Sequence, residues 1–468
     1  MRVLYVIHDY LPRHAAGAEI YLARLAADMR ARGHEVAVFC TELDPGRPDY
    51  DLRRRTHDGV PVYEVNHLRR FPDARSTWLD ERMEARFTEV LDAVAPDAVH
   101  LHHLLYHSLR YPALARRRGL PVLFTLHDYF LICPSLRGGQ LYAAWNERCT
   151  RASAERCAAC LATERVVTPI AALLLRDLLG RLGPLPSRVL ARVGRRARRL
   201  WPRGVERLSA PVRGGGPGPR LSRRTFHARQ VAAAAAIRRT DLFLAPSRHL
   251  RRRLIRGGVP ARKILHRPYG FPLDSPRPAI PRPHEPGRLS VLFLGTLARH
   301  KGPDVLVRAA VRVRDPGLRV VLRGSAVVDP AYVAELRELA AGDPRIRLAG
   351  TCPLDEVPHE LARADLLVVP SLWEENLPLV VGEALGAGVP VAASDLGGLR
   401  EWLGAGRYGP LFPAGSDEAL ADILQTLLRR PRKLAEIAGA LPRPRSIARD
   451  SADQSSILRR LIERHRSC

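Results

Sequence analysis

Residues 371–398 read SLWEENLPLVVGEALGAGVPVAASDLGG and directly follow the apolar run 366–370. The apolar run predicts a buried strand, and we expect a helix to begin near Leu377. The first N–H groups of a helix have no partner within it, so this helix start is suited to bind a phosphate. Glu383 should lie about two turns into the helix and lean back toward its start, where ribose hydroxyls could be bound. Glu375 would then lie beside the sugar or the phosphates.

On both sides of this stretch, apolar runs alternate with helix-like stretches, which is typical of a doubly wound α/β fold. The runs are continuous because helices cover both faces of such a sheet. Two series are present, and each predicts its own sheet. The first comprises residues 3–7, 35–39, 98–101, 121–126 and 242–245, and the second comprises residues 289–294, 318–322, 346–348, 366–369 and 389–392.

The two series indicate two Rossmann-like domains, residues 1–270 and 289–440, which face each other across a cleft. Between them, residues 271–288 contain Pro276, Pro278, Pro281 and Pro283 and predict a semi-rigid linker. Residues 441–468 predict a C-terminal helical tail. A basic insert at about 166–225 interrupts the first domain. We expect either that residues 187–201 form a basic amphipathic helix on an anionic bilayer, or that the insert is disordered.

The charge of the chain is strongly basic, with 75 Lys and Arg against 48 Asp and Glu, a net charge of +27. Lysine occurs only at Lys263, Lys301 and Lys433, so the excess is almost entirely arginine, in part a codon preference. No known nucleic-acid-binding motif accompanies the charge, and we expect no nucleic-acid partner. The chain has no apolar stretch of membrane-spanning length, and MRVLYVI leads directly into a strand. We therefore expect a cytoplasmic protein, free or bound at the inner face of the plasma membrane.

The motif around the two glutamates identifies a family. Its residues occur in this order: Pro370, Ser371, Glu375, Asn376, Glu383, Ala384, Gly388, Pro390, Val391, Gly397 and Gly398. This string resembles the E-x7-E signature of glycosyltransferase family 4. The resemblance implies the GT-B fold, transfer with retention of anomeric configuration, a nucleotide-diphosphate sugar as donor, and no cofactor for catalysis.

The same resemblance assigns roles to individual residues. It implies that His127, Glu375 and Lys301 are catalytic, and that the donor is bound by Gly17, Gly295, Arg299, Lys301, Asn376, Leu377 and Glu383. His127 ends a predicted strand, and Lys301 lies in LGTLARHKG, residues 294–302. One position departs from the family, which usually has arginine after the first glycine, where this chain has Thr296. Either Arg299 compensates, or fewer charges hold the diphosphate.

Two groups of potential metal ligands remain. His100, His102, His103 and His107 alternate along and after a strand, where histidines more often pack or form hydrogen bonds than bind a metal. Cys133, Cys149, Cys157 and Cys160 include a C-x2-C pair, and they could form a structural zinc site that fastens the loop after His127. Their spacing is irregular, so free thiols are the alternative.

These observations predict a glycosyltransferase that acts on a glycan or lipid-linked acceptor in cell-envelope polysaccharide or glycolipid biosynthesis. A basic insert facing a membrane would suit a lipid-linked acceptor. Two alternatives stay open: a nucleotide-sugar epimerase of the same fold, and a non-catalytic basic protein that binds membranes or nucleic acids. A dinucleotide-dependent oxidoreductase is disfavoured, because HDYLPRHAAG follows the first strand in place of G-x-G-x-x-G.

Overall fold

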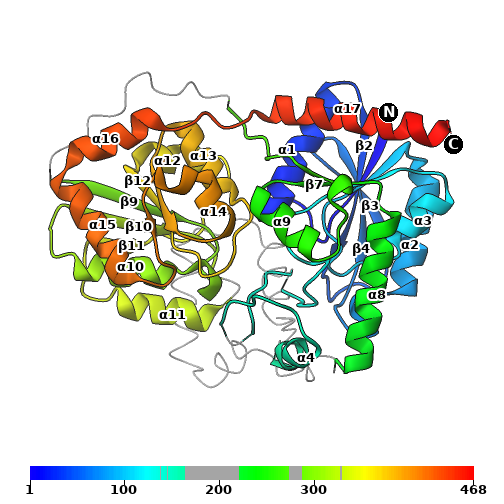
Figure 1. Cartoon of the computed structure of the whole chain (residues 1–468), viewed down its shortest axis with the longest axis horizontal. Coiled ribbons are helices and arrows are strands. Elements are labelled where there is room, and N and C mark those ends of the chain that lie inside the picture. The colour runs from blue at the N-terminus through cyan, green and yellow to red at the C-terminus, as the bar shows by residue number, and fades with distance from the viewer. Residues whose placement is uncertain (138, 145, 164–220, 274–286, 327–328, 468) are drawn as a thin grey trace.

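The computed structural model describes residues 1–137, 139–144, 146–163, 221–273, 287–326 and 329–467. They form two α/β domains side by side (Figure 1). Nearly all of the insert at 166–225 lies outside the described residues, including the stretch 187–201, as do residues 274–286 of the proline-rich segment.

The N-terminal domain contains an eight-stranded sheet of order β3-β4-β2-β1-β5-β6-β7-β8. Its strands are β1 (Arg2–Val6), β2 (Glu35–Glu42), β3 (Leu52–His57), β4 (Val60–Asn66), β5 (Ala98–Leu101), β6 (Val122–Thr125), β7 (Leu242–Ala245) and β8 (Ile264–His266). The edge strand β3 pairs antiparallel with β4, and the other neighbours are parallel. Alternate residues of β1 enter two separate cores: Leu4 and Val6 pack into one, and Val3 and Tyr5 into the other.

Helices cover both faces of this sheet. They are α1 (Gly17–Ala31), α2 (Glu81–Val94), α3 (Tyr111–Arg117), α4 (Ala154–Thr163), α8 (Arg223–Arg239) and α9 (Arg248–Arg256), with short 3-10 turns η1 (Arg75–Thr77) and η2 (Ala261–Lys263). The cores explain the arrangement, because α2, α3 and α8 pack on one face and α1 on the other. Side chains of Asp80 and Ser222 cap the first turns of α2 and α8.

The C-terminal domain contains a six-stranded parallel sheet of order β11-β10-β9-β12-β13-β14. Its strands are β9 (Leu289–Leu294), β10 (Leu318–Arg323), β11 (Ile346–Leu348), β12 (Leu366–Val369), β13 (Val391–Ser394) and β14 (Leu411–Phe412). The helices are α10 (Pro303–Arg312), α11 (Pro330–Leu339), α12 (Val357–Arg363), α13 (Leu379–Ala387), α14 (Gly397–Trp402), α15 (Asp417–Arg429) and α16 (Pro431–Ala440), with 3-10 turns η3 (Arg299–Lys301) and η4 (Gly404–Gly406). This strand order is the doubly wound one, and the predicted fold class is confirmed.

The last helix, α17 (Ile447–Arg466), crosses back and lies along α1 of the N-terminal domain (Figure 1). Asp450 accepts hydrogen bonds from Tyr21 Oη at 2.7 Å and from the N–H of Gly270 at 2.8 Å. Ile457, Leu458 and neighbouring apolar residues of α17 share a core with β1 and α1. None of the described helices is both long and apolar enough to cross a membrane.

The structure contains four strands that the sequence did not predict, β3, β4, β8 and β14, and one helix begins later than expected. The strands β3 and β4 were not predicted, because β3 reads LRRRTH and its arginines hide an edge strand whose Arg53 and Arg55 pair with Glu64 of β4. The helix expected near Leu377 begins at Leu379. Leu377 precedes Pro378, and the residue before a proline is disfavoured in helical conformation. Glu383 is therefore little more than one turn into α13, and not two.

Candidate functional site

The candidate site lies where the strand order of the C-terminal sheet reverses. The β9 strand has β10 on one side and β12 on the other, and ligands of open α/β sheets bind at the carboxyl ends of strands at such a point. Lys301 follows β9 and Glu375 follows β12. The N-terminal sheet reverses in the same way between β1 and β5, and His8 and His102 follow those strands.

Lys301 and Glu375 form a close ion pair in the structure. Lys301 Nζ lies 2.6 Å from Glu375 Oε1, and Glu375 is only 4% exposed. The same oxygen accepts hydrogen bonds from Ser371 Oγ and Trp373 Nε1, both at 2.8 Å. The Lys301 ammonium also lies 5.3 Å from the centre of the Trp373 ring. Lys301, Ser371 and Trp373 therefore hold this carboxylate as three donors. The Lys301 side chain lies at the carboxyl ends of the strands.

The start of α13 lacks any side-chain cap. The N–H of Val381 donates to Pro378 O at 3.0 Å. The N–H groups of Leu379 and Val380 are therefore those that an anion from outside the helix can bind. Glu383 is held by an ion pair with Arg24 of α1, with 2.7 Å between Arg24 Nη1 and Glu383 Oε1. This contact joins the two domains, and a ribose bound by Glu383 would compete with Arg24.

Asn376 and Leu377 contribute to the contact between the domains. Asn376 Oδ1 accepts a hydrogen bond from Ser247 Oγ at 2.7 Å, and Asn376 Nδ2 donates to the carbonyls of Leu126 and His127 at 3.4 Å each. Leu377 packs into the core that includes α1 and β1. The side chains of Asn376 and Leu377, which were expected to bind the donor, thus contact other parts of the protein. The backbone of these two residues lies just before the start of α13.

The two predicted glycines lie at strand and helix boundaries. Gly17 is the first residue of α1, and a Cβ placed on it would meet Leu379 of α13 at 3.8 Å, an ordinary contact. The starts of α1 and α13 therefore face each other from the two domains. Gly295 follows β9 with φ of +157°, a conformation that residues with a side chain rarely adopt, and its N–H donates to Arg323 O at 3.0 Å.

Arg299 points toward a different partner from the one expected. Its Nη2 lies 2.6 and 2.7 Å from the two carboxylate oxygens of Glu335 in α11, and its guanidinium stacks 4.7 Å from the centre of the Tyr332 ring. Arg299 would have to leave Glu335 to replace the arginine that the family has at the position of Thr296. Lys301 is the cation that contacts Glu375.

His127 lies two residues beyond the end of β6 and forms two hydrogen bonds through its ring. Its Nε2 is 2.9 Å from His102 Nδ1, and its Nδ1 is 2.5 Å from Tyr269 Oη. Burial, together with the charges of His103 and His100, holds the pKa of His127 well below its usual value. The ring is therefore neutral near pH 7 and acts as a hydrogen-bonding group.

A second set of titratable residues surrounds the end of β1. His8 Nε2 lies 3.1 Å from Glu19 Oε1, and His103 forms an ion pair with Asp128. Burial raises the pKa of Glu19 to about 7. Burial alone would lower the pKa of His103, but the charge of Asp128 and its hydrogen bond raise it overall. This edge of the sheet therefore holds groups that can exchange protons near neutral pH.

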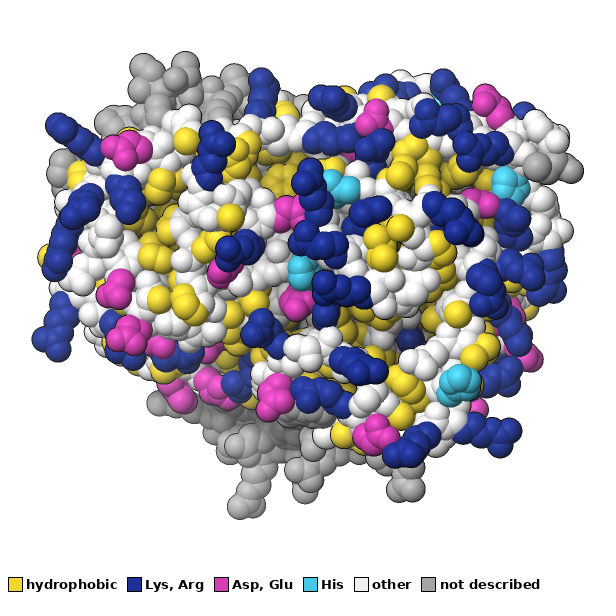
Figure 2. Space-filling view, in the orientation of Figure 1, with side chains coloured by type: hydrophobic (Ala, Val, Ile, Leu, Met, Phe, Trp, Pro, Cys, Tyr) yellow, Lys and Arg dark blue, Asp and Glu magenta, His cyan; other side chains and the backbone are white. Residues whose placement is uncertain are grey.

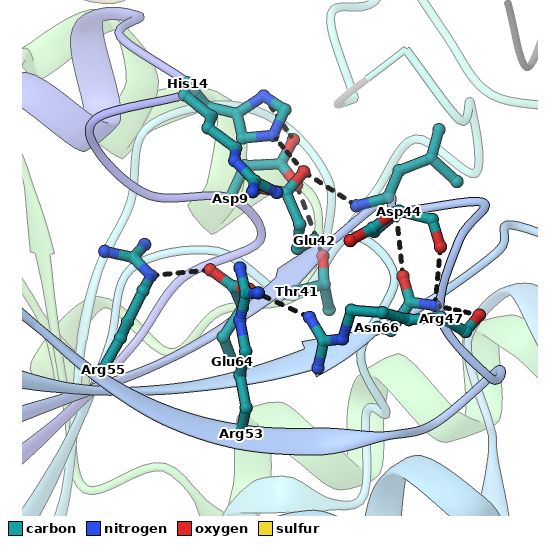
Figure 3. A network of polar contacts seen from close by, with 12 residues as sticks. Asp9, His14, Thr41, Glu42, Asp44, Arg47, Arg53, Arg55, Glu64 and Asn66 are labelled. Atoms are coloured by element: carbon teal, nitrogen blue, oxygen red, sulfur yellow. Dashed lines mark hydrogen bonds and ion pairs between the residues drawn. The ribbon is translucent and has the colours of Figure 1, made fainter. Parts of the chain in front are cut away.

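A network of ion pairs continues along the same edge to the ends of β2 and β4 (Figure 3). Glu42 Oε1 accepts from His14 Nε2 at 3.0 Å and from the N–H of Leu43 at 2.9 Å. Burial would raise the pKa of Glu42, but His14 and Arg13 lower it overall. In Figure 3, Arg47, Arg53 and Arg55 surround the buried Glu64. The sequence did not indicate this network, because the residues that pair in it come from different strands and loops.

Two carboxylates of the C-terminal domain bind α9 of the N-terminal domain. Glu401 accepts hydrogen bonds from the N–H groups of Arg248 and His249 at 2.9 and 3.0 Å, at the first turn of α9. Glu374 Oε2 lies 3.0 Å from His249 Nε2 and 3.2 Å from Arg253 Nε. Together with Ser247 and Asn376, these contacts hold the E-x7-E segment against the N-terminal domain.

The four predicted cysteines lie around one small cavity, which Cys133, Cys149, Cys157 and Cys160 all line. No disulfide joins any of the six described cysteines. Within the described ranges, no three His, Cys, Asp or Glu side chains are arranged to hold a metal ion as they stand. This holds for the histidines in and after β5 as well, and His100 Nε2 lies 2.8 Å from Thr125 Oγ1.

Several partners of the predicted site residues carried no signal in the sequence analysis. They are Arg24 beside Glu383, Trp373 beside Glu375, and His102 and Tyr269 beside His127. Tyr269 lies at the end of the predicted N-terminal domain, residues 1–270. Arg24 could have been found only by asking which residues of the predicted first helix share the face that points toward the cleft.

Both halves of the chain match family models of glycosyltransferases. Residues 16–181 match the model described as a glycosyl transferase 4-like domain, and residues 288–430 match the model described as glycosyl transferases group 1. The D-inositol 3-phosphate glycosyltransferase of Rhodococcus erythropolis is 33% identical over 167 residues, which is 34% of this chain and 38% of that protein. Its counterpart in Corynebacterium efficiens is 39% identical over 146 residues, 30% and 34% of the two chains. The matches thus span little more than a third of these curated relatives.

Solved structures resemble the whole chain. Sucrose-phosphate synthase from Thermosynechococcus elongatus has a TM-score of 0.63 at 18% identity, covering 99% of each chain. Anabaena HepE in complex with UDP and glucose has a TM-score of 0.61 at 15% identity, covering 98% of this chain and 99% of that one. At these identities the likeness concerns the fold, which is that of GT-B glycosyltransferases.

Proposed function

Because both halves of the chain carry glycosyltransferase domains, we propose that it transfers a sugar from a nucleotide-diphosphate donor to a glycan or lipid-linked acceptor, with retention of configuration. The observation that carries the proposal is the contact of Lys301 with Glu375 at the reversal point of the C-terminal sheet, beside the uncapped start of α13. Solved neighbours in complex with UDP or UDP-glucose support a nucleotide-sugar donor.

In this proposal, the C-terminal domain stabilises the leaving diphosphate. Lys301 supplies a positive charge, and the first N–H groups of α13 supply aligned donors, so negative charge that develops on the phosphate is stabilised without reorganisation. Glu383 exchanges Arg24 for the ribose hydroxyls. Glu375, already fixed by Ser371 and Trp373, orients Lys301 and accepts a hydroxyl of the sugar.

The N-terminal domain then places the acceptor. His127 is neutral and has both ring nitrogens engaged, so it contributes an oriented ring edge to the transferred sugar and no charge. The network of Asp9, His14 and Glu42 presents acids and bases that suit a polyhydroxyl acceptor. A donor phosphate oxygen on the same face as the incoming hydroxyl accepts its proton, which accounts for retention.

The acceptor belongs to cell-envelope polysaccharide or glycolipid synthesis in this proposal, and the enzyme works in the cytoplasm at the inner face of the plasma membrane. Figure 2 shows Lys and Arg side chains spread over both domains on one face of the molecule, which supports attraction to an anionic surface. Binding to vesicles with and without anionic lipid would test this part separately.

The test begins with the donor. Thermal shift with a panel of nucleoside diphosphates and their sugars identifies a stabilising donor, and transfer to candidate acceptors is then assayed. We expect Lys301→Ala and Glu383→Ala to lower kcat/KM by at least about 100-fold, since loss of one oriented electrostatic contact costs roughly 3 kcal/mol of transition-state stabilisation. Lys433→Ala, the same change at an exposed lysine of α16, serves as the control.

The outcomes separate the alternatives. Normal turnover by both site variants would show that the site is wrongly assigned. Interconversion of nucleotide sugars without any acceptor would indicate an epimerase. The anomeric configuration of the first product, measured by NMR, must equal that of the donor. Arg299→Ala decides separately whether this arginine leaves Glu335 to bind the diphosphate.

A further inference from the structure

The four cysteines come from two separate parts of the N-terminal domain. Cys133 and Cys149 lie in the loop between β6 and α4, and Cys157 and Cys160 are one turn apart on α4. All four line the same cavity, which has an internal volume of about 20 Å³. A cavity of this volume can hold one water molecule or one metal ion.

A buried arginine lies beside the cavity. Arg229 of α8 is 3% exposed, and its Nη2 donates to the carbonyls of Phe130 and Cys133, at 2.5 and 3.0 Å. No carboxylate among the described residues forms an ion pair with it, and the ionisable groups that act on it are the thiols of Cys133 and Cys157. An uncompensated buried charge is costly, so this position calls for a negative partner.

We propose that Cys133, Cys149, Cys157 and Cys160 bind one zinc ion as thiolates, and that Arg229 neutralises part of the charge of this site. Four thiols release four protons to solvent, four Zn–S bonds form, and the site carries a net charge of −2. The adjacent Arg229 guanidinium then has the anionic partner that the thiols alone do not supply. Zinc is favoured over harder cations because all four ligands are sulfur.

Binding requires the thiols to turn inward. As they stand, no three described side chains are set to hold a metal, but the sulfur of a cysteine moves by rotation about one bond between staggered positions. A bound metal lowers the pKa of a coordinating thiol, so each sulfur binds it as a thiolate.

The zinc would fasten the loop that contacts the proposed donor site. Tyr129 Oη donates to Glu374 O at 3.1 Å, and the Tyr142 ring lies 6.4 Å from that of His300, the neighbour of Lys301. Tyr142 and Arg148 also line a cavity together with Asp395 and Pro413 at the strand ends of the C-terminal domain. Fixing both ends of this loop therefore positions one wall between the two domains.

The full-length protein is purified without added metal, and its zinc content is measured by atomic emission. We expect about one zinc per chain. After exchange with Co²⁺, we expect the absorption bands of tetrahedral thiolate coordination. Cys157→Ser should lose most of the zinc, whereas Cys352→Ser, a cysteine outside the cavity, should keep it. Arg229→Met should lower zinc affinity about 10- to 100-fold in competition with a chelator.

The opposite results are equally clear. Wild-type protein with no zinc and four reactive thiols would overturn the proposal, as would a disulfide among the four cysteines or a bound iron–sulfur cluster. An unchanged zinc affinity of folded Arg229→Met would show that the arginine does not serve the metal. Since zinc content and the cobalt spectrum are measured on the wild type, misfolding of a variant does not decide the outcome.

Discussion

Buried histidines line the strand ends of the N-terminal sheet, and their protonation links the fold to pH. His100 lies in β5, fully buried, and burial lowers its pKa to about 3. In the unfolded chain its pKa returns to the ordinary value near 6.5. Above that pH neither state is protonated, and below it only the unfolded state takes up the proton. The stability that His100 contributes is therefore lost as the pH falls below about 6.5.

We predict that His100→Gln makes the protein less sensitive to acid. Between pH 6.5 and 5, the free energy of unfolding should fall by about 2 kcal/mol less than in the wild type, at about 1.4 kcal/mol per pH unit for one proton. Urea denaturation at several pH values measures this slope. His227→Gln, on the exposed face of α8, should leave the slope unchanged. Equal slopes for wild type and His100→Gln would contradict the prediction.

At the scale of elements, α13 is the helix on which the proposed donor site depends. Its Gly382 packs so closely on Phe271 that an added Cβ would lie 2.1 Å from Phe271 Cζ. Phe271 belongs to the segment that leads out of the N-terminal domain, and its N–H donates to Arg445 O at 2.9 Å. The position of α13 is therefore set by a crossing of two chain segments at a glycine.

We predict that Gly382→Ala lowers the free energy of unfolding by about 1–3 kcal/mol, since overpacking forces backbone shifts. Displacement of α13 should also weaken donor binding. Gly439→Ala is the matched control on α16, where a Cβ meets nothing within 4 Å, and it should stabilise the protein by about 0.5–1 kcal/mol. Denaturant titrations of both variants give the comparison. If Gly382→Ala is as stable as the wild type and binds the donor normally, then Phe271 moves aside without a loss of folding free energy.

The elements that the sequence predicted are those with local signals. Runs such as Ala98–Leu101 and Leu242–Ala245 are buried on both faces and stand out as apolar. The β3 strand is held by charge pairs across an edge and has no such pattern. At the site, Glu375 and Lys301 were found through the motif, and the structure joins them. By contrast, Glu383 and Asn376 have partners in the other domain, Arg24 and Ser247, and neither spacing nor composition encodes contacts of that range.

At the scale of the whole molecule, several polar contacts join the two domains, and Glu401 contributes hydrogen bonds to backbone groups. Glu401 accepts the first N–H groups of α9 and so acts as a helix cap supplied from the other domain. Its loss removes acceptors worth about 1 kcal/mol from the closed arrangement. Domain closure is part of the proposed reaction, so this contact should influence donor binding.

We predict that Glu401→Ala shifts the donor-free protein toward a more open arrangement. Small-angle X-ray scattering should show a larger radius of gyration than in the wild type, and addition of the donor diphosphate should restore the smaller value. Glu436→Ala, an exposed acid on α16, is the control. If the radius and the KM for the donor both stay unchanged, Glu401 does not hold the domains together.

The return of α17 to the N-terminal domain also determines how the molecule would bear mechanical load. Asp97 accepts the backbone N–H of Arg2 at 2.7 Å and pairs with Arg466 at 3.1 Å, so one carboxylate ties both ends of the chain. The two termini lie close together in Figure 1. A force applied between them would pull α17 away from α1 before it reached the junction of the domains. Stretched from its ends, the protein would first lose its C-terminal helix, while the two domains stayed folded.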